Sequence, residues 1–442
     1  MEPVKVGLLG LGTVGGGTVN VLRRNAEEIA RRAGRGIEVT HAAGRDLNKP
    51  RICNTEGITL TTNPQEVVDN PDIQIVVELI GGDTLALELV MKAIANGKHV
   101  VTANKALIAK HGNDIFAAAQ NKGVMVAFEA AVAGGIPIIK AIREGLAGNR
   151  IEWLAGIING TGNFILTEMR DKGSNFSDVL AEAQQLGYAE ADPTFDVEGI
   201  DAAHKLTILA SIAFGIPLQF EKVYTEGITK ITREDVVFAE QLGYRIKHLG
   251  VAKKTDNGVE MRVHPTLIPE RRLIANVDGV MNAVLVYGDA VGPTLYYGAG
   301  AGAEPTASAV VADIVDVVRT LTSDPENRVP HLAFQPNAIS NIPVSSMEEI
   351  QTAYYLKMRA EDKPGVLAEV TKILGDRGIS IEAILQKEPR GAEGKVDGQA
   401  TIIMLTHVVI EGSMNQAIAD IEALNTISGP ITRIRLEHLN KR

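Results

Sequence analysis

Cysteine is almost missing from this chain of 442 residues, in which Cys53 is the only one. A single thiol excludes an intrachain disulfide and a cysteine-based metal cluster, which suits a reducing compartment. The start of the chain also lacks the long apolar core and small-residue cleavage site of a signal peptide. These absences predict a cytoplasmic protein.

Long apolar runs and an excess of positive charge are absent too. The longest apolar runs, such as 73–80, fall well short of the roughly 18 residues that span a bilayer. Lysine and arginine number 44 against 54 aspartates and glutamates, and the net charge of −10 repels nucleic-acid phosphates and anionic lipids. We therefore expect neither nucleic acid nor membrane as a partner, and the length predicts two or three globular domains.

Short apolar runs alternate with helical stretches over residues 1–130. Strands are expected at 4–9, 37–43, 73–79, 99–102 and 124–128, with helices at about 13–32 and 85–95. This alternation predicts a dinucleotide-binding domain with a Rossmann-like, doubly wound parallel sheet.

The pattern changes after residue 130. Residues 131–305 mix helices, such as 164–172, 176–186 and 200–214, with strand-like runs such as 281–287, as in an α+β domain for substrate binding and dimerisation. We expect an alanine- and valine-rich helix at 306–322 to pack back on the first domain. Closely spaced prolines make 323–350 a linker, and 351–442 read as a ferredoxin-like βαββαβ module.

A glycine motif follows the first expected strand. Gly10, Gly12 and Gly15 bracket Thr13 and Val14 in the pattern G-x-G-x-x-G. The first glycine permits a tight turn, the second lets a pyrophosphate approach the backbone, and the third allows close packing of helix on strand. The strand before and the helix after favour dinucleotide binding over a purely structural turn.

The second expected strand ends where dinucleotide-binding domains often carry an acidic residue. Here the chain has Arg45, followed by Asp46. A guanidinium can hold the 2′-phosphate of NADP(H), which we expect to be preferred, while Asp46 leaves NAD(H) open. A surface arginine paired with its neighbour is the alternative.

Carboxylates are concentrated in residues 187–201, and a lysine follows four residues after the last of them. If a helix begins at Ile200, then Asp201 and Lys205 share a face with apolar Ile208 and Ile212. A buried charge needs a partner or a purpose. Spacing alone also allows an ordinary intrahelical ion pair worth about 0.3–0.5 kcal/mol.

This segment resembles the substrate-binding signature of homoserine dehydrogenases, which has an acidic residue, Gly-x-Asp and a lysine four residues later. Segments 101–107, 159–166 and 298–307 are similar to the family's lysine-bearing loop, substrate loop and late glycine-rich segment, in the same order. The resemblance implies an enzyme of threonine and methionine biosynthesis. Its reaction would be the reversible, NAD(P)H-dependent reduction of L-aspartate 4-semialdehyde to L-homoserine.

The resemblance also implies residue roles. Lys205 and Lys105 would flank the reacting oxygen, and one of them would supply its proton. An ammonium suits this task because it stabilises the negative charge that grows on a reduced carbonyl oxygen and can also donate a proton. The implied substrate-binding residues are Glu190 and Asp201, which would hold the amino group, with Gly187 and Asp196. Lys105 and Gly302 would also border the cofactor.

A second loop resembles one that binds a monovalent cation in the same family. By that resemblance the ligands here would be Glu129, Val132, Gly134 and Ile136. Ligation by oxygen with one formal charge suits sodium or potassium. Glycine and alanine loops also serve simply as turns, and that alternative stays open.

Residues 360–370 and 378–381 are similar to ACT domains, which bind amino acids where subunits pair. The turn at Pro364 precedes a helix whose free N–H groups could receive a carboxylate, so Gly365 and Val366 are the candidates. The family implies threonine as a feedback effector and a homodimer or homotetramer. A module that only dimerises is the alternative.

Two other functions compete with this interpretation. A Rossmann oxidoreductase that passes through a thioester needs a catalytic cysteine, and Cys53 lies far in sequence from the substrate segment. A non-catalytic amino-acid sensor on a nucleotide-binding scaffold would have little reason to keep both lysines together with their carboxylates.

Overall fold

The computed structural model describes residues 2–325, 328–387 and 398–440. Its first sheet has six parallel strands in the order β3-β2-β1-β4-β5-β6. Their bounds are β1 Val4–Leu9, β2 Ile37–Ala43, β3 Thr59–Thr61, β4 Ile75–Glu78, β5 His99–Thr102 and β6 Val126–Ala127. The order reverses between β1 and β4, as in Rossmann folds, and ligands bind at that point. The predicted doubly wound sheet is confirmed.

Two details of the first sheet differ from expectation. The third strand in chain order is β3, and the run expected as third forms β4. β3 has only three residues, none of them buried, which is too short for an alternation to be detected. The predicted helix 13–32 is divided at Asn25 into α1, Thr13–Arg24, and α2, Ala26–Ala33.

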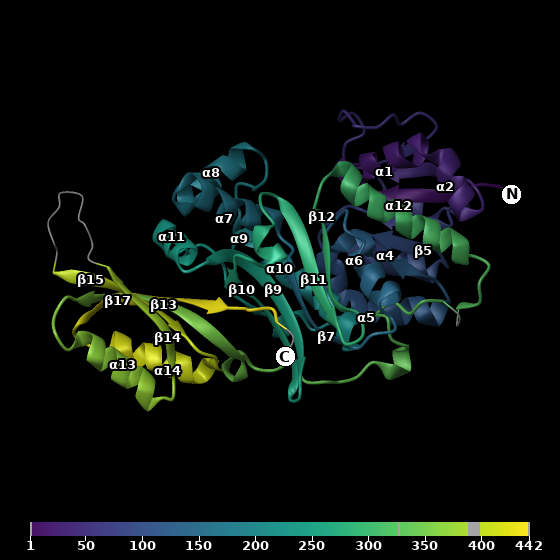
Figure 1. Ribbon diagram of the computed structural model, residues 1–442. Helices are drawn as coiled ribbons and strands as arrows, with labels where there is room; N and C mark the ends of the chain where they lie inside the picture. The colour runs from purple at the N-terminus through teal and green to yellow at the C-terminus, as the bar shows by residue number, and fades with distance from the viewer. Residues whose placement is uncertain (1, 326–327, 388–397, 441–442) are drawn as a thin grey trace.

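Helices cover both faces of this sheet, and one of them comes from late in the chain (Figure 1). α12, Ala303–Thr320, packs along α1, where a Cβ on Gly17 would lie 2.5 Å from the carbonyl oxygen of Ala303. Buried alanines and valines of α12 join the same core as β1 and β4. The other helices are α3 Pro64–Asp69, α4 Leu85–Ala95 and α5 Lys105–Lys122.

The second sheet follows the order β12-β11-β7-β9-β10-β17-β13-β15-β14. Its first five strands are β7 Ile151–Ile157, β9 Tyr244–Thr255, β10 Gly258–Pro269, β11 Met281–Gly288 and β12 Gly292–Ala299. The helices of this part are α7 Gly160–Lys172, α8 Phe176–Gln185, α9 Thr194–Val197, α10 Ile200–Phe214 and α11 Arg233–Gln241. α10 begins at the residue expected, and every residue after Ile200 in it is buried.

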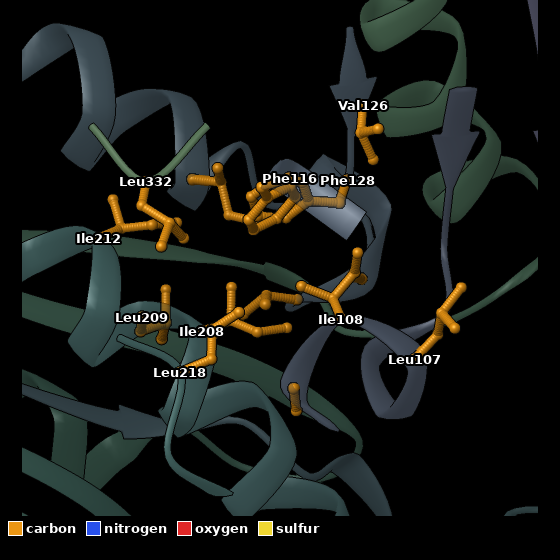
Figure 2. Close-up of a cluster of buried hydrophobic side chains, with 14 of the residues drawn as sticks. Leu107, Ile108, Phe116, Val126, Phe128, Ile208, Leu209, Ile212, Leu218 and Leu332 are labelled. Carbon is orange, nitrogen blue, oxygen red and sulfur yellow. The ribbon is translucent and has the colours of Figure 1, made fainter. Parts of the chain in front are cut away.

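A cluster of buried side chains packs α5 against α10 (Figure 2). The rings of Phe116 and Phe128 stack with their centroids 5.2 Å apart. The residues labelled in Figure 2 are Leu107, Ile108, Phe116, Val126, Phe128, Ile208, Leu209, Ile212, Leu218 and Leu332. Because interiors are closely packed, this core fixes the first turn of α5 relative to the first turn of α10.

The C-terminal residues form the predicted βαββαβ order. Its elements are β13 Gln351–Glu361, α13 Val366–Asp376, β14 Ile381–Lys387, β15 Gln399–Thr406, α14 Glu411–Glu422 and β17 Ile427–Leu436, with a short extra strand β16 Val409–Ile410. One sheet face packs on α13 and α14, and the other on α7, α8 and α11. Unexpectedly, β17 pairs with β10, so the module extends the second sheet (Figure 1).

The proline-rich segment before this module is irregular. Its described part contains three-residue 3₁₀ helices at Pro336–Ala338 and Met347–Glu349. Among the described residues, none of the helices is both long and apolar enough to cross a membrane.

Candidate active site

The first turns of α5 and α10 bring three charged side chains together. Lys105 opens α5 directly after Asn104, whose side chain caps the helix by accepting a hydrogen bond from the Leu107 N–H at 3.1 Å. On α10, Asp201 and Lys205 lie one turn apart. The Asp201 carboxylate forms an ion pair with Lys105 Nζ, 3.0 Å from Oδ1, and accepts a hydrogen bond from Lys205 Nζ at 2.6 Å through Oδ2.

Burial and charge shift the pKa values of this group. Burial lowers the pKa of Lys205, and neighbouring Lys105 adds to that effect, while Asp201 opposes it without cancelling it. Burial raises the pKa of Asp201, but the ammonium groups of Lys205 and Lys105 outweigh it and hold the carboxyl below its usual range. The result is a buried carboxylate shared by two lysines, one of which is easier to deprotonate than an ordinary lysine.

Asn159 joins this group to a second carboxylate. It caps α7, where its Oδ1 accepts from the Gly162 N–H at 2.7 Å. Its amide nitrogen donates to Asp196 Oδ1 at 2.7 Å and to Asp201 Oδ2 at 2.9 Å. Burial raises the pKa of Asp196. Sequence reasoning included Asn159 only as part of a loop, because nothing in its local pattern signals a contact with residues 37 and 42 positions away.

A cleft of about 590 Å³ opens over these charges. Lys105, Asp201, Lys205, Asp196 and Gly187 all line it, so these five predicted residues share one site. Other parts of the lining come from Val14, from the loop residues 130, 131, 133 and 134, and from segment 299–302, which includes Gly302.

Glu190 lies outside the lining of this cleft. Its side chain is exposed, and its carbonyl oxygen accepts from the Gln184 side chain at 3.0 Å. Its proposed contact with the substrate therefore stays a prediction.

The glycine turn has the shape that a dinucleotide requires. Gly10 has φ +103°, and a Cβ there would lie 2.8 Å from the Leu79 carbonyl oxygen. A Cβ on Gly15 would lie 2.3 Å from the Gly10 oxygen, whereas one on Gly12 would meet open space. Gly12 is the N-cap of α1. Backbone N–H groups at a helix N-terminus next to open space fit a pyrophosphate.

Two arginines follow β2, and they occupy different environments. Arg45 is exposed directly after the strand. Arg51 instead donates to the carbonyl oxygens of Leu11, at 2.7 Å, and of Asp46, which ties this loop to the glycine turn. Arg51 was not predicted, because it lies in an irregular loop where no periodicity indicates the direction of a side chain.

The loop after β6 packs against the glycine-rich segment. Ala133 and Gly134 both have positive φ, and a Cβ on Gly134 would lie 2.6 Å from the Gly300 oxygen. The buried Glu129 carboxylate accepts from the N–H groups of Ile139 at 2.9 Å and Lys140 at 2.8 Å. Burial and nearby Asp313 raise the pKa of Glu129 to about 7. The described residues contain no group of three His, Cys, Asp or Glu side chains arranged for a metal.

Family models match three consecutive parts of the chain. Residues 10–129 match the model described as "Homoserine dehydrogenase, NAD binding domain", and residues 137–315 match "Homoserine dehydrogenase". Residues 354–426 match "ACT domain".

Similar proteins cover the whole chain. A homoserine dehydrogenase of Pseudomonas aeruginosa is 70% identical over 440 residues, covering 100% of both chains. A crystal structure of one from Thiobacillus denitrificans is 69% identical, has a TM-score of 0.94, and covers 100% of this chain and 99% of that one. A hyperthermophilic archaeal homoserine dehydrogenase in complex with NADPH is 27% identical over 73% of this chain and 98% of its own, with a TM-score of 0.62. By sequence and structure alike, the chain belongs to the homoserine dehydrogenase family of nicotinamide-dependent oxidoreductases and carries a C-terminal ACT domain.

Proposed function

We propose that this chain catalyses the reversible reduction of L-aspartate 4-semialdehyde to L-homoserine in the cytoplasm. The observation that carries the proposal is the pair of ammonium groups on Asp201, inside a cleft that reaches the glycine turn. A bound nicotinamide supplies or accepts the hydride. The protein must then bind the substrate, stabilise charge on its oxygen and move one proton.

The two lysines differ in environment, and we assign them different roles. Lys205 is buried and uses two of its three N–H donors on Asp201 and on the Ile158 carbonyl, which leaves one for the substrate oxygen. We assign it the proton transfer. Lys105 is 33% exposed and lines the cleft, where its charge adds to the stabilisation. We assign the substrate amino group to Glu190 and Asp201, with Gly187 and Asp196 beside it; all of these except Glu190 line the cleft together with the lysines.

The test is an assay of the purified chain with L-homoserine and NADP⁺ or NAD⁺, followed by the absorbance of the reduced nicotinamide. Homoserine oxidation requires neutral Lys205, so its rate should rise with pH. Because the pKa of Lys205 is lowered, the rate should reach half its maximum below the ordinary lysine value of about 10.4. Semialdehyde reduction should fall over the same interval. An absence of turnover with both nucleotides would refute the proposal.

For the cofactor, we propose a preference for NADP(H) set by Arg45. Arg45→Ala should raise KM for NADPH about tenfold, the usual loss for one hydrogen bond to a charged group, and leave KM for NADH unchanged. Lys49→Ala, which removes another exposed cation from the same loop, is the matched control. Equal shifts for both nucleotides would remove Arg45 from the discrimination.

We also propose a monovalent cation, Na⁺ or K⁺, at Glu129 and the carbonyls of Val132, Gly134 and Ile136. Two features support the proposal: each Glu129 oxygen keeps a lone pair beyond the N–H group it already accepts, and the loop borders the cleft. Replacing Na⁺ and K⁺ by choline in the same assay tests it, and an unchanged rate argues against the ion.

For regulation, we propose that an amino acid such as threonine binds the ACT module at Gly365 and Val366, in a homodimer or homotetramer. Gly365, with φ +97°, is the N-cap of α13, so the free N–H groups of the first helical turn follow it directly. Threonine should inhibit the wild type, and Gly365→Ala, which strains this turn, should raise the inhibitory concentration severalfold. Gly378→Ala, at the other end of α13 with φ +70°, is the control. Activity that stays flat up to tens of millimolar threonine contradicts the proposal.

We further propose that the chain divides into a dinucleotide-binding domain at 1–130, joined by helix α12, a substrate and dimerisation domain at 131–305, a linker at 323–350 and the ACT module at 351–442. Limited proteolysis should cut first within 323–350.

A further inference from the structure

The C-terminal strand reaches the segment that supports the active-site carboxylates. Arg435 of β17 is fully buried, and its Nη1 donates to Glu226 Oε2 at 2.7 Å. Its Nε and Nη2 donate to Glu411. The Tyr224 hydroxyl donates to the same Glu226 oxygen at 2.8 Å. Arg435 Nη2 also donates to the Tyr224 hydroxyl at 3.2 Å. Glu226 and Tyr224 therefore tie residues 224–229, here called the support segment, to the ACT module.

The support segment contacts the turn between α9 and α10. The Ile228 N–H donates to the Val197 carbonyl at 2.9 Å, and the Thr229 hydroxyl donates to Glu198 at 3.0 Å. This turn separates Asp196, in α9, from Asp201, in the first turn of α10. A shift of the support segment would therefore move residues 197–200, which connect Asp196 to Asp201 along the chain.

His248 of β9 contacts both the support segment and the same turn. Its Nε2 donates to the Glu226 carbonyl at 2.9 Å, and the ring is buried. A Cβ on Gly199, the N-cap of α10, would lie 3.0 Å from the ring, and one on Gly162, in the first turn of α7, would lie 3.6 Å from Nδ1. The imidazole thus lies between the helix that begins before Asp201 and the helix capped by Asn159.

We propose that Glu226 and His248 are positioning residues for Asn159, Asp196 and Asp201, and that Arg435 makes this positioning depend on the C-terminal strand. The proposal rests on the proposed function, since it assigns these carboxylates to substrate binding and to holding the lysines. It gives the ACT module a direct physical route to the reaction: a change in β17 reaches the substrate carboxylates through one side chain, one short segment and one imidazole. Coupling between sites requires such an element, whose arrangement both sites can bias.

Two pairs of variants test the route. Glu226→Leu removes the carboxylate that joins Arg435 to the support segment, while Arg435 keeps Glu411 and the Tyr224 hydroxyl as partners. Glu226→Gln keeps a side chain that can still bridge. His248→Leu removes the donor to the Glu226 carbonyl, and His248→Gln retains one. Lys357→Met is the control, because Lys357 of β13 pairs with buried Asp235 of α11 at 2.8 Å. This ion pair also joins the module to the rest of the chain, but it lies outside the support segment.

Each leucine variant should raise KM for homoserine about tenfold and lower kcat, with NADPH affinity unchanged, because only the substrate side is displaced. Each glutamine variant should stay within about threefold of the wild type. Lys357→Met should lower the midpoint of thermal unfolding but leave KM unchanged. The double leucine variant should lose no more than the worse single one, because both changes break one route.

Folded leucine variants with wild-type KM and kcat would overturn the proposal, as would fully multiplicative losses in the double variant. If a leucine variant does not fold, the double variant Glu226→Gln/Arg435→Lys replaces it. Wild-type KM and kcat in this double variant would also overturn the proposal. A wild type without turnover is a failure of the proposed function instead. Calorimetric binding of homoserine to the NADPH complex would then still measure the positioning effect.

Discussion

Lys205→Ala should lower kcat for homoserine oxidation by about a thousandfold, within the range for loss of one general acid or base. The Lys205 ammonium is 2.6 Å from Asp201, lines the cleft, and keeps one N–H that is not used by Asp201 or the Ile158 carbonyl. Asp201 keeps Lys105 and Asn159 as partners, so the variant should fold. NADPH affinity should barely change, because the glycine turn is untouched. Stopped-flow or steady-state assays of both directions measure the loss.

The control for this change is Lys98→Ala. Lys98 is also buried and donates to two carbonyl oxygens, those of Asn70 and Ile73, but it lies directly before β5 and does not line the cleft. Its loss should lower stability and leave kcat near the wild-type value. If Lys205→Ala keeps near-normal turnover, Lys205 has no part in the proton transfer.

Asp201→Asn should lower kcat/KM by at least about a hundredfold, because the neutral amide no longer holds either lysine in place. The carboxylate raises the pKa of Lys205, so its removal lowers that pKa further. Homoserine oxidation in the variant should therefore reach half its maximum at a lower pH than in the wild type. The pH profile of kcat/KM measures this shift.

The same variant changes the pH dependence of stability. The pKa of Asp201 is lower in the folded than in the unfolded state, so its contribution is present above about pH 3.9 and is lost as the pH falls through the folded value. Asp201→Asn should lack this component and unfold with roughly 3 kcal/mol less free energy near pH 7. Asp235→Asn removes another fully buried carboxylate, outside the cleft, and should lose stability without the shift in the rate profile. If the pH profile of kcat/KM in Asp201→Asn is identical to that of the wild type, Asp201 does not set the pKa of Lys205.

Some of the contacts behind these predictions follow from the local sequence, and others do not. A helical repeat of 3.6 residues placed Asp201, Lys205, Ile208 and Ile212 on one face, and the whole of α10 after Ile200 is indeed buried. Resemblance supplied Lys105. The sequence contains no local sign, however, that Lys105 and Lys205 share a carboxylate, since they belong to different helices that meet only through the core of Figure 2.

The sequence by itself determined the parallel first sheet, the glycine turn, the start of α10 and the βαββαβ order of the C-terminal module, because each depends on periodicity or turn chemistry within a short window. Only the tertiary structure decided that Asn159 bridges two carboxylates, that Arg51 ties a loop to the glycine turn, and that β17 continues the second sheet beside β10. Contacts of this kind join residues far apart in the chain, and their partners are selected by packing and hydrogen bonding in three dimensions, which no local pattern encodes.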